Sequence, residues 1–416
     1  ASDDYNESEL TADVSATVSS NYTLVPDDNF EQALISLGYD DTLDDHVLTG
    51  NIIGVTYLEV NDEGISDLTG IEGFESLISL YCNQNQLTSI DLSSNTSLTH
   101  FACWGNQITS LDVSNNIALT NLECDGNLLT VLDVSNNTAL DQLRCSANQL
   151  TTLDISANTA LTGLYCSNNP LTNLDVSNNT QLTWLYCGNS FLTSLDVSNN
   201  TALTNLWVIN NQLTALDVSS NTALLNLNCE NNQLTSLDVS FNTALTELRC
   251  NDNQLIHLNM KNGVTDQLIE FNATNNSFDC IEVNAEDVDY ATENWTYANG
   301  NIDEGVGFSV VCAPEGYTYV PDNNFEQALI DLGYDDVLDD FVLTANISGV
   351  NSLVVGEKEI SNLTGIEAFT SLTSLDCRFN NLTSLDVTTN VGLTYLDLSN
   401  NQLTSIDLSN NTSLEY

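Results

Sequence analysis

Apolar residues recur along most of the chain with a period of 21 residues. A representative repeat covers residues 119–139 and reads LTNLECDGNLLTVLDVSNNTA. It divides into two halves of the form L-x-x-L-x-(C/V)-x-x-N, so that Leu122 and Cys124 correspond to Leu132 and Val134. Alternation across L-x-C and L-x-V predicts two short extended segments per repeat, with Leu and Cys or Val pointing inward.

A ladder of cysteines marks equivalent positions of successive repeats, and one valine fills its single missing step. Because one repeat cannot bury its apolar side alone, the repeats are expected to stack as coils of a β-rich solenoid with one continuous core. The ladder consists of Cys82, Cys103, Cys124, Cys145, Cys166, Cys187, Val208, Cys229 and Cys250.

This pattern resembles the bacterial leucine-rich repeats of the 21-residue class that carry a cysteine ladder, the internalin J-like proteins, over roughly residues 55–276 and 350–416. The segments VPDDNFEQALISLGYDD, LTGIE and LDVSNNTALT also resemble multi-unit secreted repeat proteins of the Bacteroidota. The resemblance implies a right-handed leucine-rich repeat coil of short parallel strands with small helical N-terminal caps. It also implies export to the bacterial cell surface and adhesion or ligand binding without catalysis.

A longer periodicity indicates one whole unit and the start of another. Pro26, Phe30 and Cys82 recur 295 positions later as Pro321, Phe325 and Cys377. The expected segments are an N-terminal tail (1–22), a helical N-cap (23–54), a first solenoid (55–279), a disulfide-closed C-cap and linker (280–317), a second helical N-cap (318–349) and an incomplete second solenoid (350–416). Because the sequence ends within a coil, we expect the natural chain to continue.

Each unit opens with residues that predict a short amphipathic helix. Asp28 and Glu31, like Asn323 and Glu326, have the spacing of a capping box, and Gly38 is expected to end the first helix. The apolar face expected to cover the end of the first coil contains Phe30, Ala33, Leu34 and Leu37.

Four aspartates follow the first predicted helix and raise the question of a calcium site. They lack the D-x-[DN]-x-[DN]-G spacing of an EF-hand loop. We therefore expect a solvated turn in preference to a metal site, and no cofactor. The four residues are Asp40, Asp41, Asp44 and Asp45.

The repeat consensus decays after His257, and residues 280–312 contain Trp295 and the only two cysteines outside the ladder positions. We predict that these two, Cys280 and Cys312, form a disulfide that closes a C-terminal cap and requires an oxidising compartment. The ladder cysteines run parallel on neighbouring coils and include no C-x-x-C pair. They are expected to be buried free thiols, neither zinc ligands nor redox groups.

The asparagine that ends the cysteine-containing half is predicted to hold the turn, because its amide can bond to backbone groups of neighbouring coils. Ser190 interrupts this column beside Phe191 and predicts a local irregularity. The column contains Asn106, Asn127, Asn148, Asn169, Asn211, Asn232 and Asn253.

The outward position of the valine-containing half is always aspartate, followed two residues later by serine. Such uniformity indicates a scaffold. We expect hydrogen bonds from Ser, Thr or backbone donors, in preference to ordered calcium, to offset repulsion between these charges. The column contains Asp91, Asp112, Asp133, Asp154, Asp175, Asp196, Asp217 and Asp238.

The outward position of the cysteine-containing half varies from coil to coil. It is filled by Tyr81, Ala102, Glu123, Arg144, Tyr165, Tyr186, Trp207, Asn228 and Arg249, and is flanked by His100, Trp104, Gln142, Trp184, Ile209 and Glu247. The resemblance implies that this half builds the concave recognition sheet, and Trp, Tyr and Arg are the residues that anchor interfaces.

The candidate ligand-binding residues are therefore Tyr81, His100, Trp104, Arg144, Tyr165, Trp184, Tyr186 and Trp207. Flat aromatic faces beside amides and carboxylates suit sugar rings and protein loops equally well. The alternative interpretation is that neighbouring rings only cover each other on a solvated sheet.

Composition narrows the class of partner. The chain has 58 Asp plus Glu against 5 Lys plus Arg, a formal net charge of -53. This charge disfavours nucleic acids, anionic membranes and polyanionic glycans, all of which are bound by clustered Lys and Arg. No apolar stretch is long enough to cross a bilayer. The three histidines are far apart, and no nucleophile or phosphate-binding motif accompanies them, so no enzyme activity is expected.

The leading expectation is a secreted or cell-surface bacterial protein that binds a protein or glycan ligand on its variable face. The alternative is a structural stalk or filament subunit that self-associates through tandem units without a specific ligand. A threonine-based ice-binding face fits less well, because the paired T-x-T spacing of such faces is absent.

Overall fold

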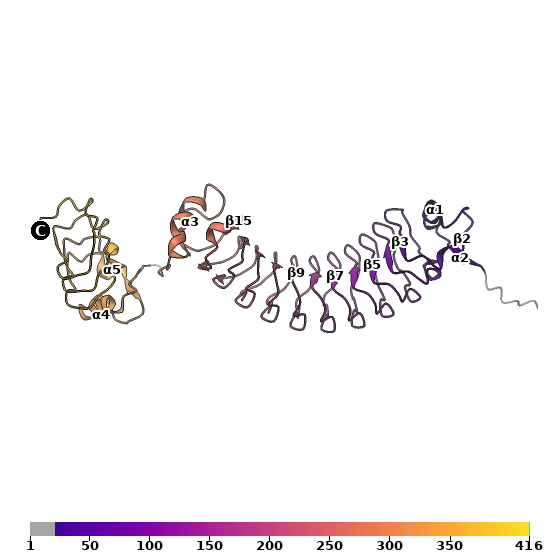
Figure 1. Cartoon of the computed structure of the whole chain (residues 1–416), viewed down its shortest axis with the longest axis horizontal. Coiled ribbons are helices and arrows are strands. Elements are labelled where there is room, and N and C mark those ends of the chain that lie inside the picture. The colour runs from indigo at the N-terminus through magenta and orange to yellow at the C-terminus, as the bar shows by residue number, and fades with distance from the viewer. Residues whose placement is uncertain (1–20, 315, 416) are drawn as a thin grey trace, which may run out of the picture. The chain divides into compact units, whose positions relative to one another are not determined.

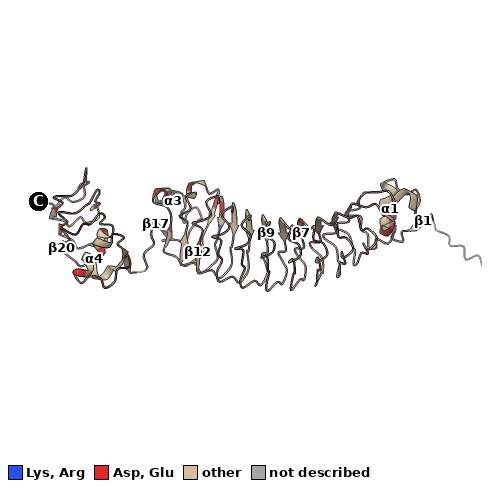
Figure 2. Cartoon of the chain, turned by 60° about the horizontal axis from the view of Figure 1, so that its bottom comes forward, with Lys and Arg blue, Asp and Glu red and all other residues tan. Residues whose placement is uncertain are grey.

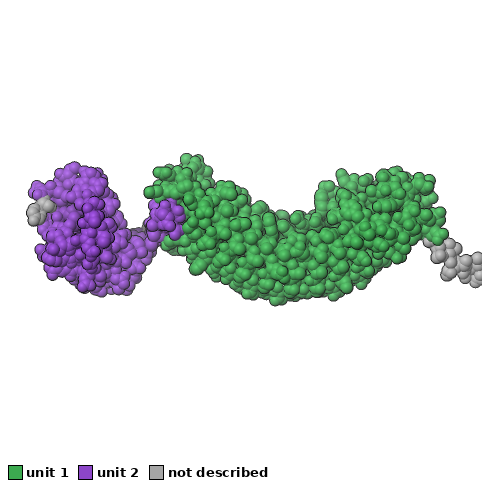
Figure 3. Space-filling view, viewed as in Figure 1, with its two compact units in different colours: residues 1–279, 289–306 green, residues 280–288, 307–416 purple. Residues whose placement is uncertain are grey.

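The computed structural model describes residues 21–314 and 316–415, which form two compact units. Unit 1 comprises residues 1–279 and 289–306, and unit 2 comprises residues 280–288 and 307–416 (Figure 3). Nearly all of the expected N-terminal tail lies outside the described residues. Within the described ranges, no helix has both the length and the apolar character that a membrane crossing requires.

Unit 1 is a solenoid built on an eleven-stranded parallel sheet. The strands are β3 (Tyr57–Glu59), β4 (Ser79–Tyr81), β5 (His100–Ala102), β6 (Asn121–Glu123), β7 (Gln142–Arg144), β8 (Gly163–Tyr165), β9 (Trp184–Tyr186), β10 (Asn205–Trp207), β11 (Asn226–Asn228), β13 (Glu247–Arg249) and β15 (Glu270–Asn272). Neighbouring strands pair residue for residue, so Leu164 lies opposite Leu185 and Leu185 opposite Leu206. The leucine-rich repeat solenoid is therefore confirmed.

The two halves of the repeat differ in their backbone pairing. Within the described part of unit 1, the valine-containing half forms paired strands only at β12 (Ser236–Asp238) and β14 (His257–Asn259). Figure 1 shows unit 1 curved, with the strands of the large sheet along its concave side. Curvature separates the coils on the outer side, which explains why the second predicted strand is mostly absent there.

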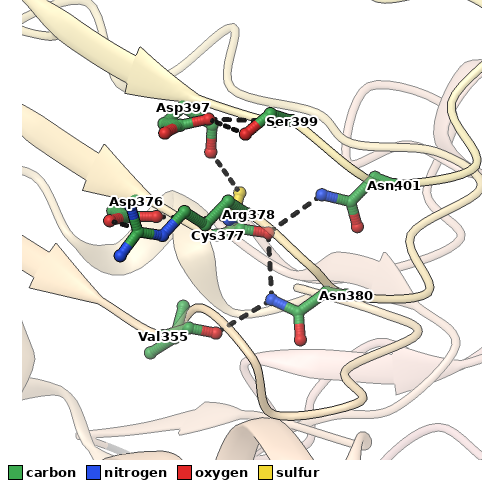
Figure 4. Close-up of polar contacts among 8 residues, drawn as sticks. All are labelled: Val355, Asp376, Cys377, Arg378, Asn380, Asp397, Ser399 and Asn401. Carbon is green, nitrogen blue, oxygen red and sulfur yellow. Dashed lines mark hydrogen bonds and ion pairs between the residues drawn. The ribbon is translucent and has the colours of Figure 1, made fainter.

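The cysteine-ladder asparagines hold the turns as predicted. Asn148 Nδ2 donates to the carbonyls of Cys124 and Cys145, at 3.0 and 3.1 Å, and Asn148 Oδ1 accepts from Leu129 N at 3.0 Å. Each amide therefore bridges neighbouring coils. In unit 2, Asn380 and Asn401 bond the Cys377 carbonyl in the same way (Figure 4).

A second, fully buried asparagine column lies in the valine-containing half. Asn158 Nδ2 donates to the carbonyls of Val134 and Asn137, at 3.0 and 2.9 Å. Its Oδ1 accepts no hydrogen bond from the described residues. This column contains Asn95, Asn116, Asn137, Asn158, Asn179, Asn200, Asn221 and Asn242.

The ladder cysteines are buried free thiols, as predicted. Burial raises the pKa of the Cys187 and Cys229 thiols to about 12. A thiol with a raised pKa that water cannot reach forms little nucleophilic thiolate.

We expect none of the nine free thiols, the eight of the ladder and that of Cys377 in unit 2, to react with a colorimetric thiol reagent in the folded chain at pH 8. All nine should react in denaturant, and the number of thiols titrated before and after adding urea measures this. Rapid labelling of several thiols in the native chain would contradict the buried ladder.

The first N-cap is built by α1 (Asp28–Ser36), α2 (Thr49–Ile52) and the antiparallel pair β1 (Tyr22–Leu24) and β2 (His46–Leu48). The predicted capping box is wrong, because Asp27 caps α1 and accepts from Asn29 N and Phe30 N at 3.0 Å each. The other Asp27 oxygen accepts from Ser66 N at 2.8 Å and so ties the helix to the solenoid. Asp28 lies in the first turn, where it cannot act as the cap.

The end of α1 and most of its apolar face follow the prediction. Gly38 has a φ of 80°, the left-handed conformation that ends many helices, and its N–H donates to the Ile35 carbonyl. Phe30, Ala33 and Leu34 are buried, but Leu37 is 47% exposed, so its predicted place in the buried face is wrong. Leu37 is the C-cap residue, which follows the last residue of the helix.

The segment after the large sheet covers its last strand. Trp295 is buried and contacts Phe271 of β15, with ring centroids 4.3 Å apart. Asn301 Nδ2 donates to the Phe271 carbonyl at 2.8 Å. The apolar end of the solenoid is thereby shielded by residues of unit 1 that follow α3 (Val288–Asn294).

The predicted pair Cys280 and Cys312 is joined in a disulfide, with Cα atoms 5.6 Å apart. Cys280 begins β16 (Cys280–Glu282), which pairs in parallel with β17 (Gly307–Ser309). Cys312 N donates to Glu282 Oε1 at 3.1 Å. Both cysteines belong to unit 2.

Unit 2 repeats the cap and the first coils. Asp322, and not the predicted Asn323, caps its first helix. Its elements are β18 (Tyr317–Tyr319), α4 (Asn323–Asp331), β19 (Phe341–Leu343), α5 (Thr344–Ile347), β20 (Ser352–Val354), β21 (Ser374–Asp376) and β22 (Tyr395–Asp397). Short 3-10 turns at Ile71–Gly73, Thr265–Gln267, Ala285–Asp287 and Ile366–Ala368 complete the two units.

Candidate functional site

Three consecutive strands of unit 1 bring four aromatic side chains into one cluster. Tyr165 of β8, Tyr186 of β9 and Trp207 of β10 are opposite one another in the strand register. The Tyr165 and Tyr186 rings meet edge to face at 5.1 Å, and the Tyr186 and Trp207 rings stack at 4.5 Å with an interplanar angle of 15°. Trp184 contacts Tyr186 at 6.0 Å. We call these four residues, together with Arg144, the aromatic strip.

The two ends of the aromatic strip have different chemistry. At one end, the Arg144 guanidinium lies over the Tyr165 ring, 4.4 Å from its centroid, in a cation–π contact. At the other, Trp207 Nε1 donates to Asn226 Oδ1 at 2.9 Å, and Asn226 Nδ2 donates to Glu247 Oε2 at 2.5 Å. The cluster therefore runs from a positive group to an acidic one.

Exposure differs among the rings of the strip. Trp184 is 41% exposed, whereas Tyr165, Tyr186 and Trp207 are half-buried. Burial raises the pKa of Tyr186, with Tyr165 and Glu247 adding to the effect, so its phenol is neutral at physiological pH. The strip offers one open indole face together with ring edges and polar atoms.

The remaining candidates lie on other strands. Tyr81 of β4 contacts Tyr57 of β3, with ring centroids 5.5 Å apart. The Tyr57 hydroxyl donates to Glu59 Oε2 at 2.6 Å, and this bond raises the pKa of Tyr57 to about 12. His100 Nδ1 bonds Thr99 Oγ1 at 2.8 Å. Strands β5 and β6 separate this tyrosine pair from β7 and the strip.

Some of the outward positions are covered. Trp104 is half-buried, and its backbone N–H donates to Asn83 Oδ1 at 3.0 Å. Ala102 and Asn228 occupy the predicted outward position of their strands, but they are only 2% and 3% exposed and offer no surface to a ligand. Asn228 Oδ1 accepts from Glu230 N, which holds this short side chain against the backbone.

Residues missed by the sequence reasoning extend both ends of the sheet's polar surface. Tyr57 precedes the first complete repeat, which is why the 21-residue pattern did not include it. Asn226 occupies the first position of its strand, 21 residues after Asn205, and that spacing could have revealed it. Glu270 of β15 was also missed, and its Oε1 accepts from Arg249 Nε at 2.6 Å.

The aspartate column forms the regular hydrogen bonds that were expected of a scaffold. Asp154 Oδ1 accepts from Ser156 N at 3.0 Å, and Asp175 Oδ1 accepts from Ser177 N at 2.9 Å. The serine hydroxyl and N–H lower the pKa of each of these carboxyls. The same bond recurs from Asp91 to Asp238, so local donors stabilise the charges along the whole column.

Comparison with known proteins identifies the family. No model of a known protein family matches the chain. The structure of the functional domain of InlJ from Listeria monocytogenes, described as including a cysteine ladder, is similar with a TM-score of 0.60 and 31% identity. The match covers 95% of this chain and 74% of that one.

A match by sequence agrees with the structural one. Internalin J of Listeria monocytogenes serotype 4b (strain F2365) is 34% identical over 71 residues, 17% of this chain. That alignment covers only 8% of the relative's length. On the similarity to the InlJ domain, which extends through the ladder itself, the chain belongs to the internalin J-like family of leucine-rich repeat proteins with a cysteine ladder.

Proposed function

We propose that unit 1 is a non-enzymatic recognition module of a secreted or cell-surface bacterial protein, and that it binds a protein or glycan ligand on its aromatic strip. The observation that carries this proposal is the contiguous run from Arg144 through Tyr165 and Tyr186 to Trp207, with Trp184 open beside it. Aromatic and arginine side chains gathered on one surface are typical of binding hot spots.

The contrast between the two halves of the repeat supports this assignment. The aspartate column is chemically uniform, and its carboxylates accept local bonds from the serines two residues later. The strip combines a guanidinium, two indoles and two phenols on neighbouring coils. Arg144 is also one of only five Lys and Arg residues in a chain of net charge -53, so it offers a rare site for an acidic group of a ligand.

Two further features support an exported protein. The Cys280–Cys312 disulfide fits an oxidising environment. The resemblance to exported repeat proteins points the same way. We propose an extracellular or cell-surface location on this basis.

A structural stalk without a specific ligand is the second candidate. The uniform aspartate column and the second unit, which repeats the cap 295 residues later, favour it. In that case the rings of the strip would only cover one another. Binding measurements separate the two functions.

The test is capture of glycans and of extracellular matrix proteins by the immobilised chain. Changing Trp184, Tyr186 and Trp207 together to Ala should weaken capture by at least about 100-fold, because each interface anchor contributes about 2 kcal/mol or more. Trp184→Ala alone, at the most exposed ring, should weaken it by about tenfold or more without changing the melting temperature. Phe241→Ala is the matched control, since Phe241 is 57% exposed on the other half of its coil. Capture that survives the triple change would favour the stalk.

A further inference from the structure

A buried carboxylate in the first cap is only half satisfied. Glu31 of α1 is 0% exposed. Its Oε1 accepts from Asp44 N and His46 N, at 3.0 Å each, and so holds the loop that leads into β2. Its Oε2 is buried and accepts no hydrogen bond from any described residue.

Other acidic groups surround Glu31. One carboxylate oxygen each of Asp28, Glu31 and Asp45 lie within 4.8 Å of one another. A second oxygen of the same loop, Asp40 Oδ2, is also buried without a hydrogen-bond partner in the described residues. Asp45 has a φ of 67°, in the left-handed region that few residues other than glycine adopt.

The cap of unit 2, which repeats the sequence of the first cap, also contains a buried, half-satisfied glutamate. Glu326 is 0% exposed, its Oε1 accepts from Asp339 N at 2.8 Å, and its Oε2 has no partner among the described residues. Asp335 Oδ2 is likewise buried and unpartnered, and Asp340 has a φ of 68°. Asn323 replaces Asp28, which keeps an oxygen ligand at that position but removes one charge.

The sequence of the first cap contains no lysine or arginine that could compensate the charge of Glu31. Residues 1–143 contain no Lys and no Arg. A buried carboxylate oxygen without a donor is costly, and crowding by other carboxylates increases that cost. Its recurrence in both caps indicates that something compensates it.

We propose that each cap binds a divalent cation of the calcium type between its first helix and the acidic loop that follows. In unit 1 the ligands are oxygens of Glu31, Asp28 and Asp45, with Asp40 beside them. Two oxygens that each lie about 2.4 Å from a calcium ion are at most about 4.8 Å apart, and the three oxygens meet this condition. In unit 2 the corresponding residues are Glu326, Asn323, Asp340 and Asp335.

The cation would fasten the loop onto the helix that closes the solenoid. Figure 2 shows acidic residues on both α1 and α4. The spacing of the four loop aspartates favoured a solvated turn over a metal site. That spacing does not reveal that Glu31 is buried with one oxygen unpaired. Glu326 gives the same outcome in the second cap, whose sequence is closely similar.

The first test is calorimetric titration of calcium chloride into the chelator-treated full chain at physiological salt. Two saturable sites are expected, with dissociation constants of about 0.1–1 mM and the tighter one in unit 1. Glu31→Gln should abolish the tighter site and leave the weaker, and Glu326→Gln should do the converse. Asp175→Asn removes one charge from the exposed column as a matched control and should change neither site.

Melting curves distinguish a bound cation from the alternative that a proton shared between the carboxylates compensates the Glu31 charge. In chelator, E31Q should melt at least as high as the wild type, because the change removes an uncompensated buried charge. In 10 mM calcium the wild type should gain several degrees, and E31Q clearly less, because only the intact site adds binding energy to the folded state.

Asp45→Asn provides a second variant should E31Q fold poorly, because Asp45 is exposed and Asn accepts a positive φ. It should weaken the unit 1 site about tenfold or more. Absence of saturable binding up to 10 mM calcium, or binding that E31Q and D45N leave unchanged, would overturn the proposal. An equally large loss of binding in D175N would also overturn it, because calcium binding would then depend only on the net charge of the chain.

Discussion

Replacing Asn148 by alanine is expected to lower the free energy of unfolding of unit 1 by about 3–5 kcal/mol. Asn148 Nδ2 donates to the carbonyls of Cys124, Cys145 and Ser146, at 3.0, 3.1 and 3.2 Å. Its Oδ1 accepts from Leu129 N at 3.0 Å. Alanine would leave Leu129 N without an acceptor in the middle of the solenoid, and an unsatisfied buried group costs about 1–3 kcal/mol. Each of the three carbonyls would also lose one of its two bonds, because only those from Asn127 Nδ2, Asn169 Nδ2 and Gly126 N would remain.

Urea unfolding followed by circular dichroism measures this loss. Asn136→Ala is the matched control, because Asn136 is exposed and its Nδ2 lies 3.4 Å from the Ser114 carbonyl. That change should alter the free energy of unfolding by no more than about 0.5 kcal/mol. Equal effects of the two substitutions would mean that the buried amide does not hold the coils together.

Replacing Cys280 and Cys312 together by alanine is expected to lower the stability of unit 2 by about 3–4 kcal/mol. The disulfide joins residues 32 positions apart, and without it the unfolded chain regains the entropy of that open loop. The unfolding transition of unit 2 in urea, compared with the wild type under non-reducing conditions, measures the change.

The chain supplies its own control for the disulfide. The other nine cysteines are already free thiols, so a reducing agent acts on Cys280–Cys312 alone. Reductant should therefore bring the wild type to the stability of the double variant and leave the double variant unchanged. A wild type whose transition does not move in reductant would contradict a stabilising role for the disulfide.

The repeat made most of the solenoid predictable from sequence. Stacking every 21 residues places Cys124 above Cys103 and Tyr186 beside Tyr165, so the ladder and the core of the strip follow from period and alternation alone. The valine-containing half was harder to predict. Its pairing depends on the curvature of the stacked coils, a property of many repeats together that no single repeat encodes.

Single positions in the caps were less predictable for local reasons. Asp27 and Asp28 are adjacent acceptors, and only the contact of Asp27 with Ser66, far along the sequence, selects the N-cap. The burial of Glu31 depends on the loop that folds over it. Asn228 has an outward register but a side chain short enough to be covered, which alternation does not reveal.

The central claim is that the aromatic strip is the face that meets the ligand. Hydroxyl-radical footprinting of the full chain, with and without a saturating amount of the molecule captured in the binding screen, tests it most directly. We predict that oxidation of Trp184, Tyr186 and Trp207 falls several-fold in the complex. Oxidation of Val131 and Phe241, which are 70% and 57% exposed on the other half of the coil, should not change. Protection of Val131 or Phe241 with no protection of the three strip residues would contradict the account.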